Sequence, residues 1–130
     1  MKSIYSLIIS ILVFIYAGCS NTTDVANNNN IISTRSVNDT LTISAVTTNY
    51  NSNQDIDLYF SVDTVKLMLG VTGYAGGNGN FKLYQDTTVI YTKNLNTNIE
   101  AVQQLIAGKP TKANISFTNY KGTVGISATK

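Results

Sequence analysis

The sequence contains no histidine and no tryptophan, and it has one cysteine and one proline among 130 residues. Without histidine, the chain cannot form a Ser-His-Asp or Cys-His catalytic arrangement or a histidine-containing metal site. A single cysteine excludes an intramolecular disulfide and a four-cysteine metal cluster. Charged residues make up only 12% of the chain and the net charge is +2, so it lacks the dense basic stripe of a nucleic-acid-binding protein. The remaining residue types that could act in catalysis, Asp, Glu, Lys, Ser, Thr and Tyr, form no recognisable constellation. We therefore predict a non-catalytic protein that does not bind nucleic acid.

Asparagine and threonine are abundant instead, with sixteen and seventeen copies, and 43% of the residues are hydrophobic. Both residue types favour strands and turns over helices. The length allows one domain, with or without a tail.

The N-terminus has the features of an export signal. Lys2 precedes an apolar run of fourteen residues, 4–17, that only Ser6 and Ser10 interrupt. A membrane-spanning helix needs about 20 residues, whereas the apolar core of a signal peptide needs about 7–15. The run therefore predicts a signal peptide.

The end of this run, Ala17-Gly18-Cys19, resembles the processing site of bacterial lipoproteins. Tyr16 departs from the pattern, because leucine is usual at that position. The resemblance implies cleavage after residue 18 and a lipid on the Cys19 thiol, which would hold the protein at a membrane. No acidic residue lies beside Ser20, and in this class that favours the outer membrane of the bacterial envelope. An ordinary secretory signal and an uncleaved anchor are the alternatives.

Residues 19–38 include four consecutive asparagines and show no sustained period, which predicts a flexible tether. Ile31-Ile32 could instead begin a first strand. The three expected parts are a signal peptide at 1–18, a lipidated cysteine with its tether at 19–38, and a folded domain at 39–130.

From Asp39 onward, apolar and polar residues alternate over 41–45, 56–62 and 65–71. Such alternation predicts half-buried antiparallel strands. The parity shift at Asp63-Thr64 predicts a two-residue hairpin between the second and third of these runs.

Two more hairpins follow from the same pattern. A turn at Asp86-Thr87 sets Leu83 opposite Ile90, and a turn near residues 120–122 sets 113–117 opposite 124–128. About seven strands result, and we predict an all-β fold, a small antiparallel β-sandwich or jelly roll.

Two segments depart from the strand pattern. The glycine-rich stretch 73–80 predicts an exposed loop that, with Tyr74, is a candidate contact surface. Residues 98–107 have apolar side chains at helical spacing before Gly108, which predicts a short amphipathic helix. The helix would form part of a long connection of the Greek-key type.

Two short stretches in the second half resemble secreted jelly-roll or immunoglobulin-like accessory domains: Phe81-Lys82-Leu83-Tyr84 is similar to one of their strands, and Tyr120-Lys121-Gly122 to a hairpin that closes two of them. The resemblance implies a β-sandwich of the kind that is also found appended to bacterial peptidases and glycan-active enzymes. It assigns no binding residue.

Asp55 and Asp57 fall on one strand face, about 6–7 Å apart by the strand rise. Two carboxylates at this spacing are required in a glycosidase, but these lie on the polar face, so we favour a solvated surface over catalysis. A calcium ion held by this pair is the milder alternative. Other oxygen ligands nearby are Asn51, Asn53 and Gln54.

Outward-facing aromatic residues suggest a glycan surface, because a tyrosine ring can stack on a sugar. The candidate contact residues are Tyr59, Tyr74, Asn78 and Tyr84. The competing interpretation is that tyrosine simply covers the polar face of a sheet as a good strand former.

Together these features predict a lipid-anchored envelope protein whose β-sandwich serves binding, adhesion or assembly, with a membrane and an envelope protein or glycan as partners. A carbohydrate-binding module using outward tyrosines and loop Asn and Asp is the first alternative. An accessory subunit or inhibitor of an envelope hydrolase is the second, and a carboxylate-based hydrolase comes last. No cofactor is expected beyond the lipid on Cys19.

Overall fold

A computed structural model describes residues 30–130, which form six strands and no helix. The strands are β1 (Ile31–Val37), β2 (Thr40–Asp57), β3 (Thr64–Gln85), β4 (Thr88–Asn94), β5 (Ile99–Ala107) and β6 (Lys112–Thr129). All of their pairings are antiparallel. The predicted all-β class is therefore correct. Within residues 30–130, no helix has the length and apolar character needed to cross a membrane.

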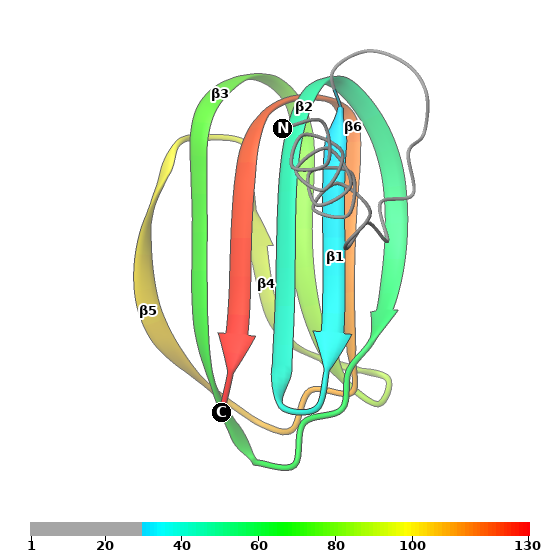
Figure 1. Cartoon of the computed structure of the whole chain (residues 1–130), viewed down its shortest axis with the longest axis vertical. Coiled ribbons are helices and arrows are strands. Elements are labelled where there is room, and N and C mark those ends of the chain that lie inside the picture. Colours follow the sequence, from blue (N-terminus) through cyan, green and yellow to red (C-terminus); the bar gives the residue numbers. More distant parts are fainter. Residues whose placement is uncertain (1–29) are drawn as a thin grey trace, which may run out of the picture.

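The six strands form one sheet in the order β1-β2-β6-β3-β4, and β5 also pairs with β3. The three long strands, β2, β3 and β6, bend over at one end, so that the sheet folds back on itself (Figure 1). The first layer consists of β1, β5 and residues 40–48, 64–72 and 121–129 of the long strands. The second layer consists of β4 and residues 50–57, 76–85 and 112–120. The predicted β-sandwich is thus built from two halves of one continuous sheet.

The bend in β3 corrects the prediction for the glycine-rich segment. Residues 73–80 are not a separate loop but lie within β3, where its register against β6 shifts on both sides of Gly76. Gly73, Gly76 and Gly77 have φ values of 61°, 143° and 80°. Glycine adopts these angles without the steric cost that a Cβ brings. The glycines therefore allow the strand to change layers without leaving the sheet.

The core lies between the two layers. Its side chains come from alternate positions of β2, β3 and β6, from Ile106 of β5, and from a few residues outside the strands. The largest fully buried side chains are Tyr120, Phe81, Leu41, Ile43, Leu67, Leu83, Leu95, Ile115, Val65, Val71, Val124 and Pro110. Burial of this apolar surface is the main driving force for folding, and a single cysteine excludes an intramolecular disulfide that would add to it.

The edge strand β1 lies within the segment that the sequence assigned to the tether. It pairs with β2 along its whole length, from Ile31 with Val46 to Val37 with Thr40. The folded part thus includes residues 31–38, and the alternative in which Ile31-Ile32 begins a strand is confirmed. The rest of the expected signal and tether, 1–29, lies outside the described residues.

No hairpin joins β2 to β3 at Asp63-Thr64, because β2 ends at Asp57 and pairs with β1 and β6 instead. Residues 58–63 connect the second layer to the first. Leu58 and Phe60 remain buried there, with exposures of 6% and 4%. The alternation of buried and exposed residues therefore continues through a connection that is not a strand. Such alternation indicates which side chains face the core, but it does not indicate which strands pair with each other.

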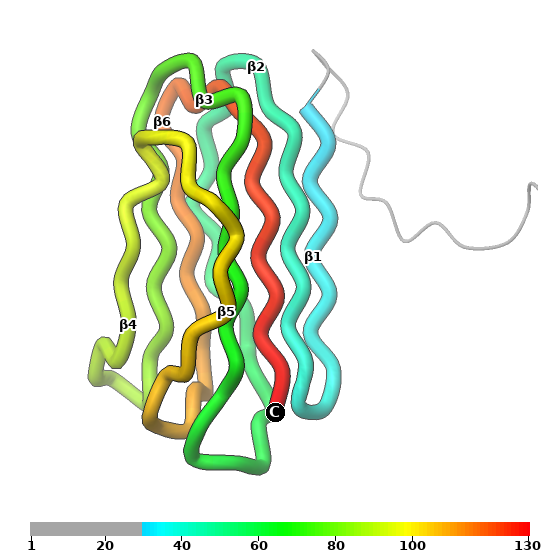
Figure 2. The backbone as a smooth tube through the Cα atoms, turned by 90° about the vertical axis from the view of Figure 1, so that its left-hand side faces the viewer, coloured from blue at the N-terminus to red at the C-terminus, as the bar shows by residue number. Residues whose placement is uncertain are grey.

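The predicted helix at 98–107 is wrong, because Ile99–Ala107 forms strand β5 along residues 64–71 of β3. Without β5, the backbone N–H and C=O groups along this side of β3 would have no strand partner. The hydrogen bonds of strand pairing therefore outweigh the helical spacing of the apolar side chains in 98–107. Val102 and Leu105 consequently remain 63% and 67% exposed. Figure 2 shows β5 as a short strand beside β3.

The turn at Asp86-Thr87 is confirmed, since Gln85 pairs with Thr88. A register shift after Leu83 sets this residue opposite Tyr91 instead of Ile90. The hairpin predicted near residues 120–122 is not formed, because β6 is continuous from Lys112 to Thr129 and both of its halves pair with β2 and β3. Residues 113–117 and 124–128 therefore lie in different layers.

Candidate functional site

The outer side of the second layer is an almost entirely polar surface, which we name the amide face. It is made by residues that alternate with the core positions of four neighbouring strands. Its polar members are Asn51, Asn53, Asp55, Asp57, Asn78, Asn80, Lys82, Tyr84, Thr92, Asn94, Lys112, Asn114, Ser116 and Thr118, and the apolar Val89 lies beside Tyr84 at its edge. Strand register arranges them in rows across the sheet: Asp55 pairs with Asn114, which pairs with Lys82.

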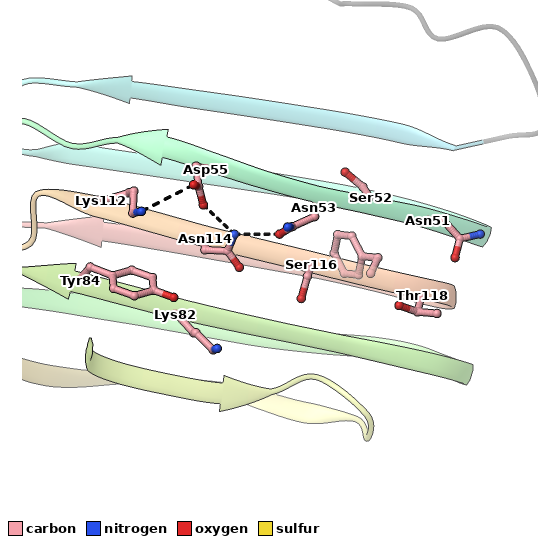
Figure 3. Close-up of a pocket in the computed structure, with 11 residues that line it drawn as sticks. Asn51, Ser52, Asn53, Asp55, Lys82, Tyr84, Lys112, Asn114, Ser116 and Thr118 are labelled. Atoms are coloured by element: carbon pink, nitrogen blue, oxygen red, sulfur yellow. Dashed lines mark hydrogen bonds and ion pairs between the residues drawn. The ribbon is translucent and has the colours of Figure 1, made fainter. Parts of the chain in front are cut away.

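A chain of polar contacts orders the centre of this surface (Figure 3). The Asn114 side-chain nitrogen Nδ2 donates to Asn53 Oδ1 at 2.8 Å and to Asp55 Oδ1 at 2.7 Å. The other oxygen of Asp55 lies 3.6 Å from the Lys112 ammonium. Lys112 also lies over the ring of Tyr84, 4.9 Å from the ring centroid. Adjacent strands thus hold these five side chains in fixed relative positions.

The surface is hollowed at this point. An open depression of about 730 Å³ lies over β2, β6 and β3, lined by side chains that include Lys82, Tyr84, Asn114 and Ser116. Among residues 30–130, the side chains of Lys82, Ser116 and Thr118 have no hydrogen-bond or ion-pair partner. These groups are available to a ligand in the hollow.

The hydrogen bond from Asn114 lowers the pKa of the Asp55 carboxyl below its ordinary value of 3.8, and the Lys112 charge acts in the same direction. Asp55 is therefore ionised at neutral pH. A calcium ion here would have to compete with the Lys112 ammonium for this carboxylate. The described residues contain no group of three or more His, Cys, Asp or Glu side chains that could hold a metal ion.

The structure does not bring the sequence-predicted contact residues into one platform. Tyr84 and Asn78 lie on the amide face, but six positions apart on β3, about 20 Å by strand rise. Tyr59 is 61% exposed and lies in the connection between β2 and β3. Tyr74 is half-buried at the bend of β3, where its hydroxyl donates to the Gly77 carbonyl at 2.8 Å. These residues therefore do not share one strand face, and their role as ligand contacts stays a prediction.

The sequence prediction missed the group that lines the hollow, above all Asn114, Ser116 and Lys112. The alternation of apolar and polar residues in the sequence does identify these three residues as outward-facing. Because β6 was expected to pair with itself, nothing placed them between Asp55 on β2 and Tyr84 on β3. Their common location depends on strand order, which periodicity does not report.

Cys19 lies outside the described residues, so the structure does not bear on its lipidation. Comparison of the chain with protein-family models, with curated proteins and with solved structures finds no match.

Proposed function

We propose that this protein is a non-catalytic binding module of the bacterial cell envelope, held at the membrane by a lipid on Cys19, and that the amide face contacts its ligand. One observation carries the binding role: three adjacent strands hold ordered donors and acceptors around a hollow in which Lys82, Ser116 and Thr118 have unused polar groups. The side chains of Asn53, Asp55 and Asn114 are already held by hydrogen bonds, so they lose little further entropy when a ligand binds.

A binding role fits these residues better than catalysis. Asp55 and Asp57 are both exposed on one outer strand face, and Asp55 is held ionised by Asn114 and Lys112. A carboxylic acid that protonates a leaving group needs the opposite environment, one that raises its pKa.

The lipid anchor is tested on the full chain isolated from bacterial membranes. We expect mass spectrometry to show an N-terminus at Cys19 with the mass of a diacylglyceryl thioether and an N-acyl chain. A free thiol on a chain that begins at Met1 would overturn this part of the proposal.

The binding role is tested with the full chain immobilised in detergent micelles and exposed to fractionated envelope material. We expect one fraction to be retained without change in its mass, and retention to be lost when Lys82→Leu and Asn114→Leu are combined. The matched control combines Thr42→Leu and Gln103→Leu, two exposed positions in the first layer. Equal retention by both double variants, or hydrolysis of the retained material, would contradict the proposal.

A further inference from the structure

We infer that the hollow of the amide face binds a neutral oligosaccharide, held by hydrogen bonds from Asn53, Asn114 and Ser116. This inference rests on the proposed function and names its ligand class.

The first argument concerns which polar atoms remain free. Asn114 uses Nδ2 for its two bonds to Asn53 and Asp55, so its carbonyl oxygen is left to accept. Asn53 accepts that bond through its oxygen, so its own amide nitrogen is left to donate. The Ser116 hydroxyl has no partner among the described residues and can do both. Neighbouring free donors and acceptors of this kind are complementary to sugar hydroxyls, each of which also donates and accepts.

The charge distribution favours a neutral ligand. A phosphate or carboxylate is bound by donors and positive charge, whereas Asn114 offers a carbonyl oxygen here and lies beside the ionised Asp55, to which it donates. Lys112 is already paired with Asp55, which leaves Lys82 as the one ammonium lining the hollow without an ion-pair partner among residues 30–130. An anion would gain one free cation and face one fixed carboxylate.

The shape of the hollow indicates a segment of a longer glycan. Its volume of about 730 Å³ lies in the range of small-molecule sites, about 300–1,000 Å³, but it is open along the sheet surface. Outward-facing polar residues continue beyond the hollow along β3, where Asn78 and Asn80 lie on the same face (Figure 3 shows the central part). A chain lying along the strands could therefore extend past the hollow.

The decisive variant is Ser116→Leu. Its hydroxyl has no partner to lose within the described chain, so the fold should survive, while the larger apolar side chain projects into the hollow and removes a polar contact. Asn114→Leu serves as a second variant that removes the central amide. Gln103→Leu is the matched control, because it changes an exposed amide in the first layer.

The experiment is calorimetric titration of the full chain in detergent micelles with hexasaccharides of neutral glucans, mannans, galactans and chitin, with acidic hexasaccharides and inorganic phosphate as comparisons. We expect at least one neutral series to bind, at least a tenfold loss of affinity in S116L and N114L, and no change in Q103L. Unfolding midpoints verify that each variant is folded.

Absence of binding to any neutral series, unchanged affinity in folded S116L, or competition by phosphate would overturn the inference. If the amide face still retains an envelope protein in that case, the ligand class is wrong and the binding role stands. If retention of envelope material is also unchanged by substitutions on the amide face, the proposed function fails as well.

Discussion

The phenolic hydroxyl of Tyr120 donates a hydrogen bond of 2.7 Å to the backbone carbonyl of Leu95, a residue 25 positions away. Both residues are fully buried. The Tyr120 ring packs against Phe117 and Tyr74, with ring centroids 4.8 Å and 5.7 Å apart. Leu95 in turn donates its backbone N–H to the Gly79 carbonyl at 2.9 Å. The bend of β6 is thereby tied to the connection between β4 and β5.

Removing this hydroxyl leaves the Leu95 carbonyl without its side-chain donor in the core. We expect Tyr120→Phe to lower the free energy of unfolding by about 1–3 kcal/mol, the cost of a buried polar group that loses its hydrogen bond. Urea denaturation followed by circular dichroism measures the change. Tyr59→Phe is the control, because Tyr59 is 61% exposed, and it should unfold like the wild type. Equal midpoints for the two variants would contradict this role of Tyr120.

The same hydroxyl predicts a loss of stability in alkali. Burial raises the pKa of Tyr120 from 10.0 to about 12, and the neighbouring Tyr74 contributes in the same direction. The folded state thus holds this proton more tightly than the unfolded state, so the stabilisation is complete below pH 10 and is lost as the pH rises toward 12. The stability difference between wild type and Tyr120→Phe should therefore shrink over this range by about 2 kcal/mol. If the stability difference between the wild type and Tyr120→Phe stayed constant from pH 10 to pH 12, the raised pKa of Tyr120 would be excluded.

The residues that face the core were largely predictable from the sequence, whereas the pairing partners of each strand were not. Ile43, Leu67 and Phe117 are buried as their alternation requires. Alternation depends only on which side of a strand meets the apolar layer, and that information is local in the sequence. Strand pairing depends on backbone groups far apart in the chain, which is why the predicted hairpins at residues 63–64 and 120–122 did not form.

The candidate site shows the same division. Asp55 and Tyr84 were recognisable as outward-facing residues, but they come together only through Lys112 on the intervening strand β6. Tyr74 looked available for a ligand because glycines surround it in the sequence. In the structure these glycines shape the bend of β3, and Tyr74 packs against Tyr120 instead.

Asp39 predicts a change of stability in acid. Its carboxylate accepts bonds from the Ser61 backbone N–H at 2.6 Å and from the Ser61 hydroxyl, and it lies 3.3 Å from the Lys130 ammonium. The hydrogen bond from the Ser61 backbone N–H is the largest cause that lowers the pKa of Asp39 from 3.8. The Ser61 hydroxyl contributes next, and Lys130 makes a smaller contribution. The stabilisation is therefore present above about pH 3.8 and is lost as the pH falls through the lowered folded value.

We expect the unfolding midpoint of Asp39→Asn to vary less between pH 5 and about pH 2 than that of the wild type. Asp86→Asn is the matched control, since Asp86 also has a positive φ, 55° against 58°, and its side chain has no partner among residues 30–130. Because asparagine tolerates this backbone conformation, both changes isolate the carboxylate. Parallel acid profiles for Asp39→Asn and the wild type would show that Asp39 contributes nothing.

The bend of β3 predicts a difference between two of its glycines. A Cβ at Gly77 would overlap the backbone of Asn119 on β6, whereas a Cβ at Gly73 would meet no atom within 4 Å. Both residues have positive φ, 80° and 61°, so alanine at either site carries the same kind of backbone strain, about 1–2 kcal/mol. Only Gly77→Ala adds a steric clash with backbone, and its total cost should reach about 3 kcal/mol or more. Thermal unfolding of the two variants measures this difference in stability. Equal losses of stability would mean that the bend of β3 can move away from the bend of β6 without energetic cost.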